Sequence, residues 1–588
     1  MTNDDRFRLD RIPATEDDWR DAVDGVLKGR PFEKVLVNQT AGGLDIQPLY
    51  APASTEPILP VDPDRVAYGW DIRQRHEATS PSACQAAVLD DLEHGVTSIE
   101  LGTPATAWGL DELRDALEGV LLEIAPVVLA PHTDLDSARA LVDLLDERGD
   151  ALTSGCWLGL DPIGAYARNR GVGAVEQVAA FAASIADTHP NVVACTIDTT
   201  RYVDAGADEV QEIAWMLATG VAMLRALEVA GLPVERAAAT IGFRVAADAD
   251  QFLTIARLRA ARSLWGSVLA TCGVDTCPSR FHAVTSPGMF SRRDAAVNML
   301  RSTSAAFGAG VGGADSVTVL PFDGSDSTLA RRNARNIHHL LIEESGVNRL
   351  VDPAAGSGFV ESLTDRLCEA AWSTFQQVEA DGGMVVALES GAVETAIDAA
   401  WSARLERLAT RKESVTGVSE FPDDAPGAVI PEPVGGFPVR RPAAPFEALR
   451  DAADRARGAG GSPAVHLAAL GSLADHTARS TWITNFLAVG GLDAIGGDAD
   501  GAASAADAAF EQAGASVVVL CSSDPVYAEL AAPAATALKA AGADFVALAG
   551  HPGERRDELA AAGVDAFFHV GVDVLAALTD LHERLGVR

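Results

Sequence analysis

Basic residues are scarce in this 588-residue sequence. Lysine and arginine together number 46 against 83 aspartates and glutamates, so the formal net charge at pH 7 is −37. A chain this acidic repels phosphate backbones and anionic lipid headgroups. We therefore expect no nucleic acid and no membrane surface among its partners.

Cysteine is scarce as well, with seven residues spread from Cys84 to Cys521. An odd number over so long a chain argues against an extracellular disulfide framework. Cys272 and Cys277 lie close together, but no second pair with zinc-finger spacing accompanies them, which favours reduced thiols over metal ligands. The start lacks a signal-peptide pattern, and no run of about 18 uncharged apolar residues occurs. These absences predict a cytoplasmic protein.

Residues 1–60 show no regular alternation of secondary-structure elements. An amphipathic stretch over residues 19–27 precedes two short strand-like runs separated by Gly42-Gly43, which predicts a helix and then a β-hairpin. The segment has many apolar residues and little core of its own. We interpret it as an arm that packs either on its own chain or on a partner subunit.

From residue 96 the sequence becomes regular. Short apolar runs rich in β-branched residues recur about every 36 residues, the length of a strand, a helix and two loops. Eight such units close into a (β/α)8 barrel, whereas a doubly wound sheet explains the alternation but not the count. We assign residues 61–400 to this barrel. The predicted strands begin near Val96, Pro126, Trp157, Val192, Ala239, Phe281, Val317 and Arg349.

A second, smaller α/β unit follows the barrel. A helical stretch over residues 358–411 leads into residues 416–445, which are dense in proline and glycine and indicate a linker. Five short strands in the last part of the chain are typical of a flavodoxin-like parallel sheet. We place the helical and linker region at 401–460 and the small domain at 461–588, so the predicted fold class is α/β. The strand candidates are 464–470, 492–495, 516–521, 544–549 and 566–570.

Active sites of (β/α)8 barrels lie at the carboxyl ends of the strands, a region called the mouth below. The first predicted strand ends near Glu100 without paired histidines, and isolated histidines do not make the convergent ligand shell of a catalytic metal. We interpret His132 and His282 as loop or structural histidines, and the mouth by itself names no reaction. Its polar residues are His132, Asp161, Asp198, Thr199, Thr200, Arg201, Arg244, His282, Thr285, Ser286, Asp323 and Asp352.

The segment from Asp352 to Phe359 follows the last predicted strand, where barrels often bind phosphate through backbone amides. It contains only Gly356-Ser-Gly358, which is too short for a dinucleotide fingerprint. A phosphate site and a simple tight turn from strand to helix explain it about equally well.

Four stretches of the sequence resemble the cobalamin-dependent acyl-CoA mutases, and among them the methylmalonyl-CoA mutase family. They are Gly69-Trp-Asp-Ile-Arg-Gln74, residues 256–265 (ARLRAARSLW), Thr285-Ser-Pro-Gly288 and residues 343–357 (EESGVNRLVDPAAGS). The resemblance extends over nearly the whole chain. It implies a barrel threaded by coenzyme A and a carboxy-terminal domain that presents adenosylcobalamin to the mouth. The implied reaction is the radical interconversion of methylmalonyl-CoA and succinyl-CoA.

The cofactor motif of that family is incomplete in this chain. The family loop reads D-x-H-x-x-G, whose histidine is the lower cobalt ligand and whose aspartate orients it. Here His476 is present, but Ala474 and Arg479 replace the aspartate and the glycine. The family's Ser-x-Leu loop becomes Ser522-Ser-Asp524, and a later double glycine becomes Ala549-Gly550. A carboxylate is costly where the apolar cofactor tail must pass, so the resemblance implies a fold that has lost its ligand.

The barrel positions also depart from the catalytic pattern. Arg75 stands where the family has a tyrosine that wedges against the cofactor, and Thr200 and Arg201 replace a tyrosine and a histidine that contact the substrate. His282 matches a family histidine. A radical enzyme must hold its reactive intermediate in a precise position through several side chains, so one retained histidine cannot support the reaction. The other replaced positions are Thr240 and Gly242, for an arginine and a serine, and Val311 and Gly313, for a glutamine and a histidine.

The resemblance therefore implies a non-catalytic small, or beta, subunit of a heterodimer. Its partner would be a large catalytic chain that carries adenosylcobalamin, while this chain would bind no cofactor and no metal and would supply no catalytic residue. A catalytically competent homodimeric mutase with unusual substrate groups is the alternative. A regulatory relative that engages a mutase transiently is a third hypothesis.

Overall fold

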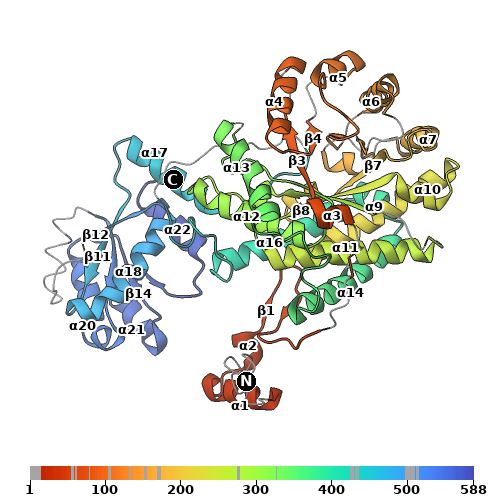
Figure 1. Ribbon diagram of the computed structural model, residues 1–588. Helices are drawn as coiled ribbons and strands as arrows, with labels where there is room; N and C mark the ends of the chain where they lie inside the picture. The colour runs from red at the N-terminus through yellow and green to blue at the C-terminus, as the bar shows by residue number, and fades with distance from the viewer. Residues whose placement is uncertain are drawn as a thin grey trace, which may run out of the picture.

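The computed structural model consists of a closed barrel, a small five-stranded sheet and an amino-terminal arm (Figure 1). The small domain lies beside the barrel, and the arm extends away from both (Figure 1). The structure describes residues 15–53, 58–59, 63–77, 80–102, 108–131, 134–150, 155–168, 174–274, 279–325, 327–423, 430, 436–496, 510 and 515–587.

Eight parallel strands close the barrel in the order β10-β3-β4-β5-β6-β7-β8-β9, which confirms the predicted architecture. Strands β7 and β8 are buried along their whole length, because helices cover one face and the barrel interior the other. The strands are β3 (Asp71–His76), β4 (Ser98–Leu101), β5 (Val127–Leu129), β6 (Trp157–Leu160), β7 (Val193–Asp198), β8 (Ile241–Ala247), β9 (Arg280–Thr285) and β10 (Ser316–Thr318).

The count of eight strands was predicted correctly, but one predicted position was wrong and one strand was missed. The first barrel strand is β3, which the sequence pattern missed because it is a polar run of Arg73, Gln74, Arg75 and His76 after Ile72. No strand begins near Arg349, since residues 345–357 form turns after the π-helix η4 (Leu340–Glu344). Each predicted strand from Val96 to Val317 is therefore one place later in the barrel than the sequence suggested.

Helices cover the outside of the barrel, and the local sequence sets their ends. Helix α4 (Pro81–Glu93) begins with proline after the N-cap Ser80, whose hydroxyl accepts from the Ala83 amide. Helix α6 (Leu135–Arg148) begins after the N-cap Asp134 and ends at Gly149, whose φ of 80° suits glycine. The others are α3 (Pro63–Tyr68), α5 (Leu110–Ala116), η2 (Gly164–Arg168), α7 (Val175–Ile185), α8 (Thr200–Asp204), α9 (Glu209–Val229), α10 (Val234–Ala239), α11 (Gln251–Thr271), η3 (Pro287–Met289), α12 (Ala295–Val311), α13 (Thr328–His339), α14 (Gly358–Ala380), α15 (Met384–Glu389) and α16 (Ala392–Ala409).

Helix α9 is long and apolar enough to cross a membrane by length and composition, yet 72% of its most apolar window is buried inside the structure. Its buried side chains, among them Trp215 and Leu217, belong to the barrel core. It is therefore a core helix of the barrel.

A buried histidine makes the barrel sensitive to acid. His338 at the end of α13 accepts a hydrogen bond at its Nδ1 from Trp70 Nε1 at 2.9 Å. Burial, with a smaller contribution from neighbouring His339, lowers the pKa of His338 to about 3. This histidine therefore stabilises the fold fully above its unfolded pKa of about 6.5, and the contribution is lost as pH falls toward 3.

We expect the protein to lose about 2 kcal/mol of unfolding free energy at this site between pH 7.5 and pH 5. The His338→Gln variant should not show this loss, because its side chain can accept from Trp70 without taking up a proton. The measurement is urea denaturation of both proteins at both pH values, with exposed His94→Gln as the matched control. An equal pH dependence for wild type and His338→Gln would contradict the assignment.

The small domain contains a parallel sheet in the order β12-β11-β13-β14-β15, the flavodoxin-like order, which confirms the prediction. Helices pack on both of its faces, in two separate apolar clusters. Its elements are α17 (Ala444–Gly458), β11 (Ala464–Ala469), α18 (Leu473–Val489), β12 (Asp493–Gly496), β13 (Val517–Cys521), α20 (Asp524–Ala540), β14 (Phe545–Ala549), η5 (Gly553–Arg555), α21 (Arg556–Ala561), β15 (Ala566–Phe568) and α22 (Val574–Arg584).

The amino-terminal arm contains the predicted helix and hairpin. Helix α1 (Glu16–Leu27) precedes α2 (Phe32–Leu36), and β1 (Asn38–Gln39) pairs antiparallel with β2 (Asp45–Ile46). Leu27 is the single buried residue of α1.

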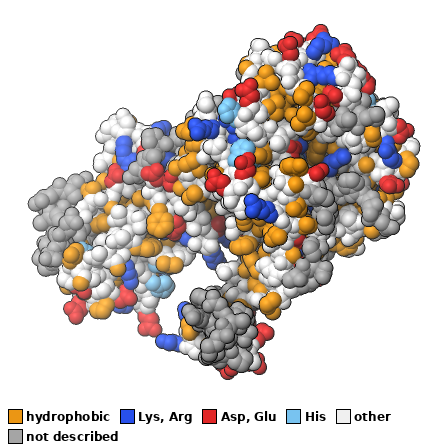
Figure 2. All heavy atoms as spheres, viewed as in Figure 1, with side chains coloured by type: hydrophobic (Ala, Val, Ile, Leu, Met, Phe, Trp, Pro, Cys, Tyr) orange, Lys and Arg blue, Asp and Glu red, His pale blue; other side chains and the backbone are white. Residues whose placement is uncertain are grey.

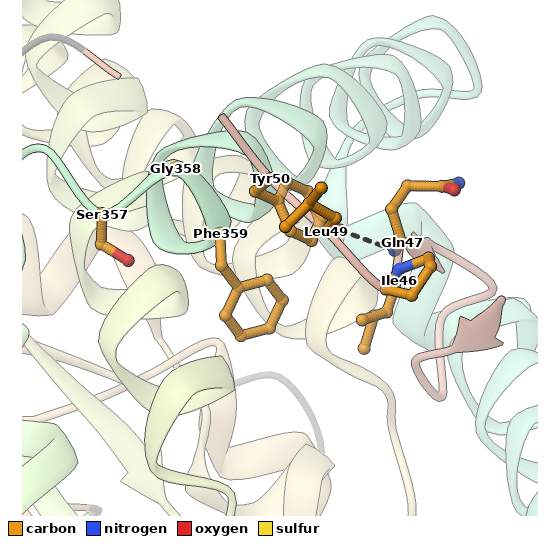
Figure 3. A pocket seen from close by; sticks show the side chains of 8 residues that line it. Ile46, Gln47, Leu49, Tyr50, Ser357, Gly358 and Phe359 are labelled. Atoms are coloured by element: carbon orange, nitrogen blue, oxygen red, sulfur yellow. Dashed lines mark hydrogen bonds between the residues drawn. The ribbon is translucent and has the colours of Figure 1, made fainter. Parts of the chain in front are cut away.

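Hydrogen bonds and a ring contact attach the arm to the barrel helices. The Gly42 amide donates to Glu209 at 2.9 Å, and Arg366 donates to the Asp45 carbonyl at 2.8 Å. A pocket of about 440 Å³ opens at the base of the arm, where the Tyr50 ring approaches Phe359 of α14 at 5.3 Å (Figure 3). The pocket is lined by Ile46, Gln47, Pro48, Leu49, Tyr50, Ser357, Gly358 and Phe359.

Acidic side chains are spread over the face of the molecule drawn in Figure 2. They lie on both the barrel and the small domain in this view (Figure 2), and basic and apolar side chains lie among them. The net charge thus favours solubility, and no single acidic patch dominates this face.

Candidate functional site

Glu100 of β4 lies at the centre of the barrel interior, where its side chain is fully buried. Its carboxylate is 3.3 Å from Arg244 of β8 and 3.8 Å from Arg75 of β3. His282 of β9 is 3.9 Å away and also within 2.8 Å of the Thr318 hydroxyl. Burial, Arg73 and Arg244 hold the pKa of His282 well below its ordinary value, so this histidine is neutral. The central charges are therefore one carboxylate and its arginines.

A second group of ions lies above this centre, at the mouth. Asp198 at the end of β7 pairs with Arg244 at 3.3 Å and with Arg168 of η2, and it accepts two hydrogen bonds from Thr200. Arg168 also pairs with Asp161 at 3.1 Å. Each carboxylate here meets at least one guanidinium, so the mouth contains a connected network of ion pairs.

The two mouth carboxylates titrate in opposite directions. Burial alone would raise the pKa of Asp198, but Arg244, Arg168 and the Thr200 hydrogen bonds outweigh it and hold the pKa at about 2. Asp161 has weaker compensation, so burial raises its pKa to about 6 although Arg168 acts to lower it. Asp161 therefore takes up a proton in mildly acidic solution while Asp198 stays ionised.

Below the centre, toward the amino ends of the strands, bulky side chains fill the barrel. Arg73 of β3 lies over the Trp157 ring at 5.3 Å and donates to Ser98 at 2.9 Å. The Trp157 ring meets His282 edge-on at 6.2 Å and packs with Val128 and Val193 in a small apolar cluster. A side chain at Gly242 would collide with Trp157, since an added Cβ would lie 2.6 Å from the ring.

Glu100, His282, Arg73, Trp157 and Arg244 are all at most 6% exposed, and together they occupy the barrel axis over the described residues. Arg73 and Trp157 were not among the residues that the sequence placed at the mouth, and Glu100 was named only as the end of the first predicted strand. The alternation of charged and uncharged residues in β3 was the available signal for Arg73, but it was hidden because that strand was not predicted.

The structure divides the other predicted mouth residues between the two ends of the barrel. Asp161, Asp198, Thr200 and Arg244 meet at the mouth, as expected. The prediction for Asp352 was wrong, because its segment follows η4 and lies at the amino end, where Asp352 accepts from Arg259 at 3.0 Å and from the Ile58 amide at 3.1 Å. The segment therefore does not continue a barrel strand, and the phosphate site suggested there is not supported.

The remaining mouth residues have local hydrogen bonds. Ser286 donates to Asp204 at 2.6 Å, the Thr285 hydroxyl accepts from Leu320, and Asp323 accepts from Ser325. His132 and Cys277 lie outside the described residues. Among the residues that the structure describes, no group of three His, Cys, Asp or Glu side chains is arranged to hold a metal ion.

The positions at which the catalytic family members have residues that contact cofactor or substrate lie in two places in this barrel. Arg75, Thr200 and Arg201 are near the mouth, where Arg201 donates to the Phe437 carbonyl at 3.1 Å. The other four lie at the amino end of the barrel, before or at the start of β8 (Thr240 and Gly242) and at or just after the last residue of α12 (Val311 and Gly313). From β8 it is Arg244, two residues after Gly242, that enters the central network.

In the small domain, the segment containing His476 forms the start of helix α18. Ser472 caps this helix, and Asp475 closes the capping box by accepting from the Ser472 amide and hydroxyl at 2.9 and 2.6 Å. His476 is 2% exposed and its Nδ1 lies 3.3 Å from the Ser480 hydroxyl. The histidine is thus turned into the domain.

Arg479 lies across the carboxyl end of β14. It donates to the Ala549 carbonyl at 2.6 Å and to Asp524 at 2.9 Å. Its guanidinium is so close to Gly550 that an added Cβ there would lie 2.0 Å from Nη1. The residue that replaces the motif glycine therefore occupies space at this edge of the sheet.

The strand order of the sheet reverses between β11 and β13, the usual ligand crevice of such folds. Ser522 closes this point by donating to the Leu470 carbonyl at 2.7 Å. Tyr527 is 5% exposed, and its hydroxyl accepts from the Ser522 amide at 2.8 Å and lies 2.9 Å from the Leu520 carbonyl. Side chains of the domain itself thus fill the crevice.

Comparison with known proteins decides the family. A family model described as methylmalonyl-CoA mutase matches residues 166–438. The methylmalonyl-CoA mutase small subunit of Streptomyces virginiae is 43% identical, over 98% of this chain and 97% of its own length. The chain belongs to the methylmalonyl-CoA mutase family. The corresponding small subunit of Propionibacterium freudenreichii subsp. shermanii is 36% identical over 98% of this chain and 95% of its own length.

The chain also matches a family member that is named methylmalonyl-CoA mutase and not small subunit, but this match covers a smaller part of both chains. The methylmalonyl-CoA mutase of Escherichia coli is 36% identical over 37% of this chain and 31% of its own length. The chain therefore resembles the small subunits along its whole length, and it is a member of an isomerase family.

Proposed function

We propose that this chain is the non-catalytic small subunit of a heterodimeric methylmalonyl-CoA mutase. It would support a large subunit that interconverts methylmalonyl-CoA and succinyl-CoA by adenosylcobalamin radical chemistry. The observation that carries the proposal is the filled barrel axis. A pantetheine chain needs a continuous passage, and in the described residues the axis is occupied by Arg73, Trp157, Glu100 and Arg244.

The geometry of the small domain supports the same proposal for the cofactor. A lower cobalt ligand needs a histidine held out in a loop with a partner at its other ring nitrogen. His476 lies inside a capped helix, and Asp475, one residue before it, is engaged in the capping box. Arg479 and Tyr527 fill the edge where a nucleotide tail would enter. These residues do not fit the group, so we place adenosylcobalamin on the large subunit and none on this chain.

The arm supports a partner. Isolated helices shorter than about 12–15 residues are marginal in water, and the 12-residue α1 buries only Leu27 within this chain. Val26 is 72% exposed and Val35 is 40% exposed. A large subunit that covers this side of the arm would stabilise it. We further propose that the assembly is cytoplasmic and that it engages neither nucleic acid nor membrane.

The decisive experiment is purification of the chain alone and together with a large subunit. We expect the chain alone to show no mutase turnover with added adenosylcobalamin and no histidine-ligated cobalamin in its absorption spectrum. The mixture should form a stable one-to-one complex, with activity and thermal stability above those of the large subunit alone. The coenzyme is supplied at the same concentration in both preparations.

The competing hypotheses predict other results. A catalytically competent homodimer would turn over methylmalonyl-CoA by itself and would bind cobalamin with histidine coordination. A transient regulator would change the activity of the large subunit without co-purifying with it. Either result would overturn the proposal of a permanent, inactive subunit.

A further inference from the structure

We infer that the barrel and the small domain of this chain form one mechanical unit, so that the small domain does not swing away from the barrel mouth. The inference concerns the isolated chain and does not depend on its partner or on any ligand. Three separate connections between the two bodies carry it.

The first connection is one continuous helix that belongs to both cores. Val393 and Ile397 of α16 are buried in the barrel core. Leu408 of the same helix is fully buried in the core of the small domain, together with Val415 and Val418. An α-helix rises about 1.5 Å per residue, so roughly 16 Å of rigid rod joins the two cores. A hinge at this point would require the helix to break or one core to open.

The second connection is a cluster of charges between the loop after β9 and helix α17. Glu447 has a fully buried side chain and pairs with Arg292 at 3.1 Å and with Arg441 at 2.7 Å. Arg293 pairs with Asp451 at 2.8 Å and with Asp454 at 2.6 Å. Separation of the domains would leave the buried carboxylate without Arg292, an outcome that low-dielectric surroundings strongly disfavour.

The third connection is a strap, residues 436–441, which runs along the rim of the mouth. The Phe437 amide donates to the Ala167 carbonyl at 2.8 Å, and the Arg440 amide donates to the Asp204 carbonyl at 2.7 Å. The Phe437 ring packs against Tyr166 and Tyr202, at 6.5 and 6.0 Å.

Close backbone approach fixes the start of this strap. Gly436 has a φ of 75°, and an added Cβ would lie 2.3 Å from the Ala167 carbonyl oxygen. The strap leads directly into α17, so the contacts at the rim and the charge cluster belong to one continuous segment of the chain. In Figure 1, α17 and α22 lie between the small sheet and the barrel, consistent with a domain held against the barrel by these elements.

Hydrogen exchange of the isolated full chain, measured by mass spectrometry, tests the inference. In the wild type we expect the amides of α17 to be protected at least 1,000-fold, to the same extent as those of barrel helix α12. The double variant Arg292→Ala, Arg293→Ala should speed exchange in α17 and in residues 436–441 at least tenfold and leave strands β7 and β8 unchanged. The matched control is Arg114→Ala, which removes an ion pair with Glu147 on the outside of the barrel.

Three results would overturn the inference. The first is exchange of the wild-type α17 amides within seconds, and the second is a double variant whose exchange equals that of the Arg114→Ala control. The third comes from small-angle X-ray scattering, and it is a rise in the wild-type radius of gyration between 0.1 and 1 M NaCl. If the double variant does not fold, the exchange and scattering of the wild type still decide, because the shared helix α16 does not depend on the two arginines.

Discussion

Replacement of Glu100 by alanine is expected to lower the free energy of unfolding by about 3–5 kcal/mol, the range measured when one partner of a buried ion pair is removed. The change leaves Arg75 and Arg244 facing each other in the barrel interior with one fewer carboxylate. The measurement is equilibrium denaturation in urea, monitored by tryptophan fluorescence. A loss below about 1 kcal/mol would show that the interior is hydrated and that the pairs are weak.

A matched double variant separates a structural role from a catalytic one. Buried ion pairs can often be replaced by apolar residues of similar volume without loss of stability. We therefore expect Glu100→Leu with Arg244→Met to recover most of the stability lost in Glu100→Ala. The complex with the large subunit should keep its activity in both variants. A folded double variant whose complex has lost its activity would show that this network takes part in the reaction.

Charges placed on the exposed side of the arm should weaken association with the large subunit by about 100-fold. The variant is Val26→Asp with Val35→Asp, at positions 72% and 40% exposed in this chain. Burial of one valine contributes about 1.5 kcal/mol or more, and two such contributions amount to about two orders of magnitude in the dissociation constant. Titration calorimetry with the purified large subunit measures the effect.

The control for the arm is Val229→Asp at the end of α9, a valine that is 88% exposed on the barrel. It adds the same charge away from the arm and should bind as tightly as the wild type. All of these chains should have the same melting temperature when isolated, because the substituted valines are exposed. Equal affinities for the arm variant and the control would place the interface elsewhere.

Most of the fold was predictable because the spacing of apolar residues along the sequence indicates which segments are buried. Strands such as β7 and β13 are short apolar runs buried on both faces, and their pattern is distinct from that of the surrounding helices. Strand β3 escaped detection because Arg73 and Arg75 point into a polar barrel interior instead of an apolar core. The strand predicted near Arg349 was an apolar run that follows a π-helix and forms turns.

The site was less predictable. A replaced motif residue shows that a cofactor or substrate contact is missing, but it does not show which side chains occupy the site instead. The sequence indicated that Arg479 stands in a glycine position, but not that its guanidinium would lie against Gly550 and Ala549. Likewise, Trp157 gave no signal beyond an apolar strand, yet its ring faces His282 and Arg73 across the axis. Such contacts depend on which face of each short strand points inward, and a shift of one residue reverses that choice.

Closure of the barrel has a consequence for biosynthesis. Strand β10 pairs with β3 through Ser316 and Asp71, so the two edges of the sheet meet only after nearly 250 intervening residues have been made. Until then, a nascent chain leaving the ribosome exposes an unpaired edge at β3 and at each newly added strand. Such edges recruit other chains, and parallel pairing of distant segments is slow. We therefore expect molecular chaperones that shield this growing edge during translation to raise the soluble yield of the chain.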